Sequence, residues 1–133
     1  MRNAIFAIAV ASLTLGATGA WAQSRSARDG EIRLTRMLES RVAGAPASCV
    51  ATTDNSHDLI VIDEVGVVYD TGATFYVARA TEPDKLRWTD RIEFIRASNK
   101  RLCTSDKIWT FDRHTGLFTG TVQLGDFVPY TRG

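Results

Sequence analysis

The first 22 residues have the three parts of a secretory signal peptide, and this leader decides in which compartment the remaining chain folds. Arg2 provides a positive start, an apolar run follows over residues 4–17, and Ala20-Trp21-Ala22 places small residues at the −3 and −1 positions of a cleavage site. The strongly apolar part is shorter than the roughly 20 residues that a membrane-spanning helix needs. We therefore expect cleavage before Gln23 and a periplasmic or secreted protein without an integral membrane segment.

Two cysteines, Cys49 and Cys103, remain after cleavage. In an oxidising compartment, two otherwise unpartnered thiols are most simply explained by one intramolecular disulfide; the alternatives are two separate buried thiols or an intermolecular bridge. Closing a loop of about 55 residues would stabilise the fold by about 4 kcal/mol. The two cysteines and two histidines lack the CxxC or HxxxH spacing of a zinc site, so we predict no metal and no cofactor.

Charge argues against nucleic acid as a partner. Cleavage removes Arg2, one of 16 basic residues, and none of the 15 acidic ones, so the mature chain has a formal net charge of zero. Nucleic-acid-binding proteins usually show a basic excess, because neutralising phosphates supplies most of their affinity. We expect instead a protein partner or a cell-envelope ligand, whose identity the sequence leaves unknown.

The mature chain has the length of one domain with a modest core. Residues 23–28 are polar and are predicted to be a flexible lead-in to a single β-rich domain over residues 29–133. Asp29 is a suitable N-cap for a helix that Gly44 and Pro46 would stop. The apolar stripe of this helix is expected to contain Leu34, Met37, Leu38 and Val42.

From residue 47 onward, short β-branched and aromatic runs alternate with turn signals. The fold class is therefore predicted to be mainly β (α+β): one N-terminal helix followed by six to seven antiparallel strands, in a small barrel or a curled sheet. The clearest hairpin spans residues 107–124, where Gly116 can adopt the left-handed conformation that such turns require. The other strands are expected at residues 59–63, 67–69, 74–79 and 92–96.

The strongest enzymatic signal is Asp70-Thr71-Gly72-Ala73, preceded by Val67-Val68-Tyr69. It resembles the catalytic turn of retropepsin-like aspartic proteases, in which two aspartates of a dimer share a proton and activate water. Leu124-Gly125 lies where such folds place a downstream Leu-Gly segment. The same residues are ordinary turn formers between strands, and a glycine-rich flap between the two motifs is lacking. We favour the turn and keep a protease using Asp70 as the alternative.

The other candidate residues give weaker signals. His57 lies among turn-forming residues, and the same segment fails as a calcium loop because Leu59 and Val65 stand at positions that require glycine and glutamate. His114 is expected in a turn, and no Gly-x-Ser-x-Gly nucleophile motif is present. We predict no catalytic residue. A recognition surface is the remaining possibility, built from some of the aromatic residues Trp88, Trp109, Phe111, Phe118, Phe127 and Tyr130, of which most are expected in the core.

A broader likeness covers most of residues 47–130, which resemble an uncharacterised family of small secreted proteins of Gram-negative bacteria. The matching pieces are Cys49-Val50, Val61-Ile62-Asp63, Val68-Tyr69 with Gly72, Tyr76-Val77-Ala78-Arg79, Asp90-Arg91-Ile92, Arg101-Leu102-Cys103, Ser105-Asp106-Lys107-Ile108 and Leu124-Gly125-Asp126-Phe127-Val128-Pro129-Tyr130.

This resemblance implies a structural pairing but no activity. Members often carry a second cysteine pair, near the positions of Leu86 and Thr121, and this chain has neither cysteine. The loss of both fits a bond between Cys49 and Cys103. In the family pattern the region of Asp70 is a variable turn, which disfavours the protease. The expected function is an exported, non-catalytic module that binds a partner or associates with the envelope.

Overall fold

The computed structural model describes residues 23–52, 59–87, 90–95 and 100–133. The leader over residues 1–22, His57 and Trp88 lie outside the described residues. Among the described residues, the fold is mainly β, with one α-helix and ten strands in three antiparallel sheets, and no helix there is long and apolar enough to span a membrane. The elements are α1 (Arg25–Met37), β1 (Arg41–Ala43), β2 (Cys49–Ala51), β3 (Leu59–Ile62), β4 (Gly66–Asp70), β5 (Thr74–Arg79), the 3-10 helix η2 (Pro83–Lys85), β6 (Asp90–Ile95), β7 (Arg101–Cys103), β8 (Lys107–Asp112), β9 (Phe118–Val122) and β10 (Val128–Arg132).

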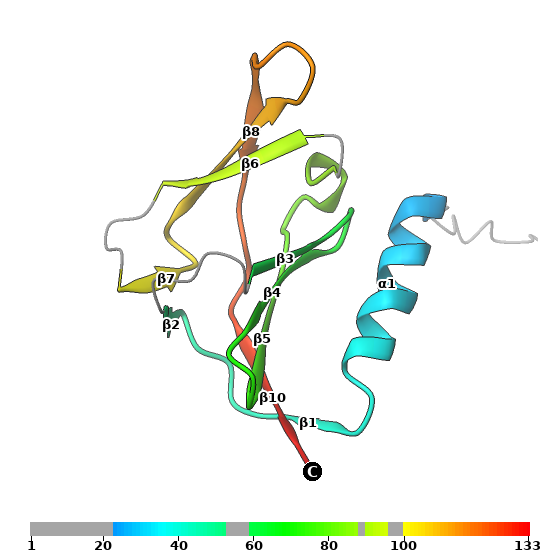
Figure 1. Ribbon diagram of the computed structural model, residues 1–133, viewed down its shortest axis with the longest axis vertical. Coiled ribbons are helices and arrows are strands. Elements are labelled where there is room, and N and C mark those ends of the chain that lie inside the picture. Colours follow the sequence, from blue (N-terminus) through cyan, green and yellow to red (C-terminus); the bar gives the residue numbers. More distant parts are fainter. Residues whose placement is uncertain (1–22, 53–58, 88–89, 96–99) are drawn as a thin grey trace, which may run out of the picture.

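A central five-stranded sheet, in the order β1-β10-β5-β4-β3, separates the helix from the two smaller sheets, β2-β7 and β6-β8-β9 (Figure 1). Each sheet is open, with two edge strands among the described residues. Of the two predicted arrangements, the fold is therefore the curled sheet and not the small barrel. The number of strands exceeds the predicted six to seven because β1, β2 and β7 have only three residues each, too few to show an alternating pattern.

Alternation along β4 shows how the layers are held together, because side chains of successive strand residues point to opposite faces. Val68 joins the helix-side cluster, which contains Leu34 of α1, whereas Val67 and Tyr69 join the main core on the other face. The fully buried members of the main core come from all three sheets and from the loops between them: Val67, Val122, Leu86, Leu102, Ile108 and Phe127.

The helix begins earlier than the pattern predicts. Ser24, not Asp29, is the N-cap, and its hydroxyl oxygen accepts a hydrogen bond from the Ala27 N–H at 3.0 Å. Residues 25–28 therefore form the first turn of α1 and are not a flexible lead-in. The Ser24 and Ser26 hydroxyls donate to the carboxylates of Glu64 and Asp63 in the β3–β4 turn, which holds this end of the helix on the sheet.

The helix also ends earlier, at Met37 instead of near Gly44. Ser40 has a φ of 62°, a left-handed conformation that does not continue a helix. The chain then turns into β1, where Val42 pairs with Thr131 of β10. Val42 is therefore an exposed strand residue and does not belong to the apolar stripe of the helix.

Gly30 sits at the closest approach of α1 to the sheet. A Cβ at this position would lie 2.6 Å from the Asp63 carbonyl oxygen and 2.8 Å from Cγ2 of Val65. Alanine favours a helix over glycine by about 1 kcal/mol, but here the clash outweighs that gain. We expect Gly30→Ala to lower the free energy of unfolding by about 1–3 kcal/mol, the usual cost of overpacking.

Urea denaturation of the mature protein measures this effect. Thr35→Ala is the matched control, because Thr35 is an exposed position of the same helix. The control should stay within about 0.5 kcal/mol of the wild type. A Gly30→Ala protein as stable as the Thr35→Ala protein would show that the helix does not approach the sheet so closely.

Candidate functional site

Three aromatic rings form an exposed cluster on the outer face of the β6-β8-β9 sheet. On β8, Ile108 and Thr110 point inward and are buried, whereas Trp109 and Phe111 point outward. The strand register places Phe118 of β9 opposite Phe111, across a β-bulge. The ring centroids lie 6.4 Å apart for Trp109 and Phe111, and 5.9 Å apart for each of these rings and Phe118, all in edge-to-face geometry. We call Trp109, Phe111 and Phe118 the aromatic face.

This cluster remains accessible to solvent. Phe118 is 58% exposed and Trp109 is 38% exposed, and Leu117, which precedes β9, is 67% exposed. Edge-to-face pairs contribute about 0.5–1.5 kcal/mol beyond the area they bury, so the rings hold one another in place. The aromatic face is consequently a contiguous apolar surface and not a set of separate side chains.

Charged residues of both signs border the aromatic face. The Arg91 guanidinium of β6 lies over the Phe111 ring, 4.7 Å from its centroid. Glu93, on the same strand, pairs with Trp109 in the register and lies 3.9 Å from Arg91, measured from carboxylate oxygen to guanidinium nitrogen. Lys107 is an exposed residue of β8 and lies on the same side of this strand as Trp109. The border is thus mixed and not uniformly basic or acidic.

The other aromatic residues considered for recognition have structural roles. Phe127 is fully buried in the main core, where its backbone forms a bridge with Ala47. Tyr130 of β10 is half-buried against the helix-side cluster. Sequence reasoning did not single out Arg91 or Leu117, which come to the aromatic face only through strand pairing and the hairpin turn.

The β8–β9 turn that carries this surface is fixed by a carboxylate. Oδ1 of Asp112 accepts hydrogen bonds from the N–H groups of His114 and Thr115, at 2.7 and 2.9 Å. His114 is an exposed turn residue, and Gly116 has the positive φ, 72°, expected of this turn. The Thr115 and His114 N–H groups lower the pKa of Asp112 below its ordinary value of 3.8, because they stabilise the ionised form.

This lowered pKa predicts how the turn responds to pH. Since the folded pKa lies below the unfolded one, ionised Asp112 stabilises the fold above pH 3.8, and the contribution is lost as the pH falls through the folded pKa. Asp112→Asn should melt at a lower temperature than the wild type at neutral pH, and the difference should shrink below pH 3.8. Melting temperatures of both proteins between about pH 2 and pH 7 measure it. A difference that does not change with pH would contradict this role.

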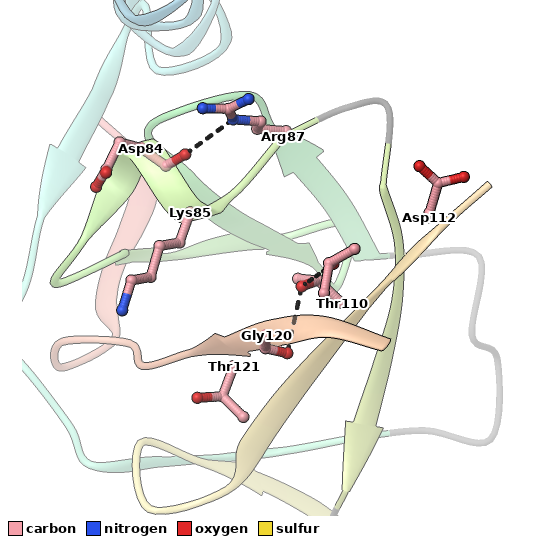
Figure 2. A pocket seen from close by; sticks show the side chains of 8 residues that line it. Asp84, Lys85, Arg87, Thr110, Asp112, Gly120 and Thr121 are labelled. Atoms are coloured by element: carbon pink, nitrogen blue, oxygen red, sulfur yellow. Dashed lines mark hydrogen bonds between the residues drawn. The ribbon is translucent and has the colours of Figure 1, made fainter. Parts of the chain in front are cut away.

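A cavity of about 480 Å³ lies between η2 and the β8–β9 hairpin (Figure 2). Its polar groups are mostly bonded to near neighbours. Lys85 forms an ion pair with Glu82, Nε of Arg87 donates to the Asp84 carbonyl oxygen at 3.2 Å, and the Thr110 and Thr119 hydroxyl oxygens lie 2.7 Å apart. Figure 2 shows Lys85 and Asp112 at opposite ends of the cavity. These groups do not converge on one point, so we do not take the cavity as the functional site.

The aspartate of the protease-like motif is used within its own turn. Oδ1 of Asp70 accepts a hydrogen bond from the Gly72 N–H at 2.7 Å, and the Thr71 hydroxyl donates to the Thr74 carbonyl oxygen at 2.9 Å. Gly72 has a φ of 87°, which glycine adopts without strain. This geometry is that of a side-chain-capped turn between β4 and β5 and favours the turn interpretation of the motif.

No known protein family, curated protein or solved structure matches this chain. Function is therefore inferred from the geometry of the described residues. Within them, no group of three or more histidine, cysteine or acidic side chains is placed to hold a metal ion.

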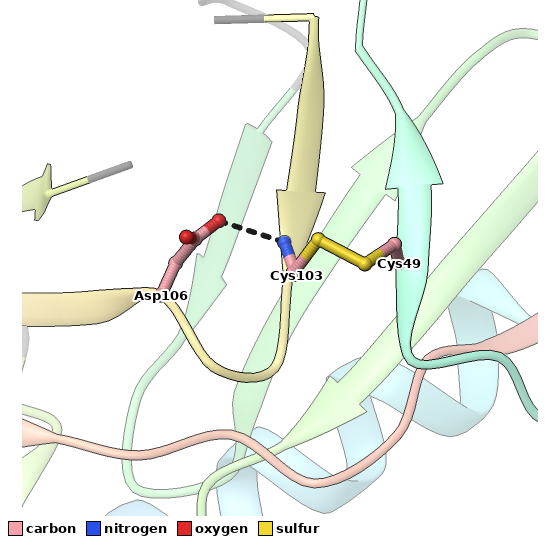
Figure 3. Close-up of a disulfide and its surroundings, with 3 residues drawn as sticks. All are labelled: Cys49, Cys103 and Asp106. Carbon is pink, nitrogen blue, oxygen red and sulfur yellow. Dashed lines mark hydrogen bonds between the residues drawn. A yellow bond between two sulfur atoms is a disulfide. The ribbon is translucent and has the colours of Figure 1, made fainter. Parts of the chain in front are cut away.

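The disulfide between Cys49 and Cys103 is present, as the sequence predicts, and joins β2 to β7 (Figure 3). The two residues are directly opposite in the register, and their Cα atoms are 4.0 Å apart. Asp106 closes the turn that follows β7: its buried carboxylate accepts a hydrogen bond from the Cys103 N–H at 2.8 Å, and its own N–H donates to the Cys103 carbonyl oxygen at 3.0 Å. This carboxylate therefore has a structural role beside the crosslink.

Proposed function

We propose that this chain is an exported, non-catalytic binding module, periplasmic or secreted, which contacts its partner through the aromatic face. The observation that carries the proposal is the outward orientation of Trp109, Phe111 and Phe118 on a sheet whose inner face already builds the core. Contiguous exposed apolar patches are uncommon on monomeric proteins and mark interaction sites. Tryptophan and arginine are also enriched among the residues that contribute most to binding energy, and both are present here.

The structural use of three aspartates supports binding rather than catalysis. Asp70, Asp106 and Asp112 each accept hydrogen bonds from backbone N–H groups of their own turns. Such carboxylates stabilise turns, and for Asp112 the bonds from Thr115 and His114 lower the pKa of the side chain and favour its ionised form. A general acid at neutral pH requires the opposite shift.

Two further features support export and the family resemblance. A disulfide between strands far apart in sequence is typical of proteins that fold outside the cytoplasm. The segment around Leu86 lies beside β9, because η2 packs against that strand. The family that this chain resembles often carries a second cysteine pair near the positions of Leu86 and Thr121. Such a pair requires these two segments to lie close together.

Photo-crosslinking tests the binding role. Benzoylphenylalanine is introduced at Leu117, beside the aromatic face, or at Ile32, an exposed apolar residue of α1 that serves as the matched control. Each protein is produced with its leader in the native host and irradiated in whole cells. We expect adducts from position 117 that disappear when Phe118→Ser is added, and none from position 32. Identical adducts from both positions, or none from either, would contradict the proposal.

The protease alternative requires its own assay. Purified mature protein is incubated with casein at acidic pH, in parallel with Asp70→Asn. Because the asparagine side chain retains the oxygen that accepts the Gly72 N–H, the variant keeps the turn while losing an ionisable carboxyl. Cleavage by the wild type that Asp70→Asn abolishes would replace the binding module with a retropepsin-like enzyme.

A further inference from the structure

We propose that the aromatic face is occupied by the same face of a second copy of this chain, so that the protein is a twofold-symmetric homodimer. The inference rests on the proposed function, because it names the partner that covers this surface. It follows from the distribution of apolar side chains, the placement of charges and the inclination of the aromatic rings.

The apolar side chains gather on one side of one sheet. Among the described residues, six large apolar side chains are exposed, and four of them lie on the outer face of β6-β8-β9 or in its hairpin turn: Ile95, Trp109, Leu117 and Phe118. The inner face of the same sheet packs Ile108 and Val122 into the core. Among the described residues, this sheet is thus covered on one face only, as is each half of a β-sandwich, in which two sheets pack about 10 Å apart.

The charges on this surface complement their own rotated copy. Arg91 and Glu93 have opposite signs and lie next to each other on the outward-facing side of β6. A twofold axis that lies between the two copies and passes midway between these two residues places Arg91 of one protomer opposite Glu93 of its partner. The mature chain has no formal net charge, so two copies do not repel each other at long range. Such isologous contacts are the commonest among soluble oligomers.

The same features disfavour other classes of ligand. An anionic polymer or an anionic membrane would be attracted by a large excess of cations, whereas the border has two cations, Arg91 and Lys107, and one anion, Glu93. A sugar chain stacks on rings that lie flat in one surface, whereas these rings are inclined to one another by 61° to 79°. Leu117 and Ile95 add aliphatic surface of the kind found in homodimer interfaces.

Sedimentation velocity of the purified mature protein tests the homodimer. Between about 1 μM and about 500 μM the wild type should pass from monomer to dimer by mass action. Phe118→Glu, a change at an exposed residue, should weaken the dimer at least about tenfold, because it places a carboxylate in the apolar contact. Ile32→Glu is the matched control: it introduces the same charge at an equally exposed residue of α1 and should leave the dimer unchanged.

A charge reversal tests the orientation of the two copies. Arg91→Glu should weaken the dimer by placing two carboxylates together, and the double change Arg91→Glu with Glu93→Arg should restore it, because the reversed pair is again complementary. Circular dichroism of each variant establishes that the fold is retained.

Three outcomes would overturn the homodimer: a monomer at every concentration, a dimer that Phe118→Glu leaves intact, or a dimer that Ile32→Glu weakens equally. The crosslinking experiment separates this failure from failure of the proposed function. A monomeric protein whose position 117 captures a different protein, dependent on Phe118, would retain the binding role and reject the second copy as the partner. Adducts of twice the mass of the chain would support both.

Discussion

Mature protein in which Cys49 and Cys103 are both replaced by alanine is expected to lose about 4 kcal/mol of its free energy of unfolding. The crosslink joins residues 54 positions apart, so its removal returns a large amount of conformational entropy to the unfolded chain. The strands that it joins depend on it strongly. β2 and β7 have three residues each and form a separate two-stranded sheet, an arrangement that is marginal in water without further support. Here that support comes from the disulfide and from Val50 and Leu102, which pack into the main core.

Guanidinium denaturation with and without dithiothreitol measures this loss. Reductant should destabilise the wild type to about the level of the double alanine variant and should leave that variant unchanged. Ser105→Ala is the control, because it alters an exposed residue in the turn after β7 while retaining the crosslink. Equal stability of the wild type in both conditions would mean that the disulfide does not stabilise the fold.

Sequence patterns predicted the elements that rest on local signals. The cysteine pairing followed from the compartment and the cysteine count, and the β8–β9 hairpin followed from Gly116 between two apolar runs. The β4–β5 turn followed from the Asp70-Thr71-Gly72 sequence. In each case the residues that fix the structure are neighbours in the chain, or are the only available partners.

The helix start and the short strands depended on contacts that the pattern does not contain. Ser24 and Asp29 are both good N-caps, and the choice is made by distant carboxylates, Asp63 and Glu64, which anchor the serines of the first turn. β1 exists because β10 returns from the far end of the chain to pair with it. No local pattern within residues 41–43 predicts that pairing.

The three rings of the candidate site were among the six aromatic residues considered from the sequence, but neither their selection nor their orientation was predictable. Alternation along β8 places Trp109 and Phe111 together and opposite Ile108, but a period of two does not say which side faces the core. The answer comes from β6 and β9, which place Ile92, Phe94 and Val122 on the inner face. The larger aromatic rings therefore lie on the outer face, although large apolar side chains are usually found in the interior.

Phe127→Ala is expected to lower the free energy of unfolding by about 3–5 kcal/mol, the usual cost of emptying a phenylalanine site in a core. Phe127 is 0% exposed, the largest of the fully buried side chains, and its backbone bridge to Ala47 ties the last strand to the first part of the β region. Its side chain contacts a cluster drawn from all three sheets, so neighbouring residues cannot easily collapse into the space that it leaves.

Phe118→Ala is the matched comparison, because it makes the same chemical change at a residue that is 58% exposed. It should cost less than Phe127→Ala, about 1–2 kcal/mol, because it removes the edge-to-face pairs with Trp109 and Phe111 but empties no buried site. Urea unfolding is measured at protein concentrations low enough to keep the chain monomeric, so that any stability gained from self-association does not enter. The contrast tests whether Phe118 lies outside the core. The binding role requires it to contribute less to the fold than a core phenylalanine and much to the contact. Equal losses of stability in the two variants would place Phe118 in the core and would contradict the exposed position of the aromatic face.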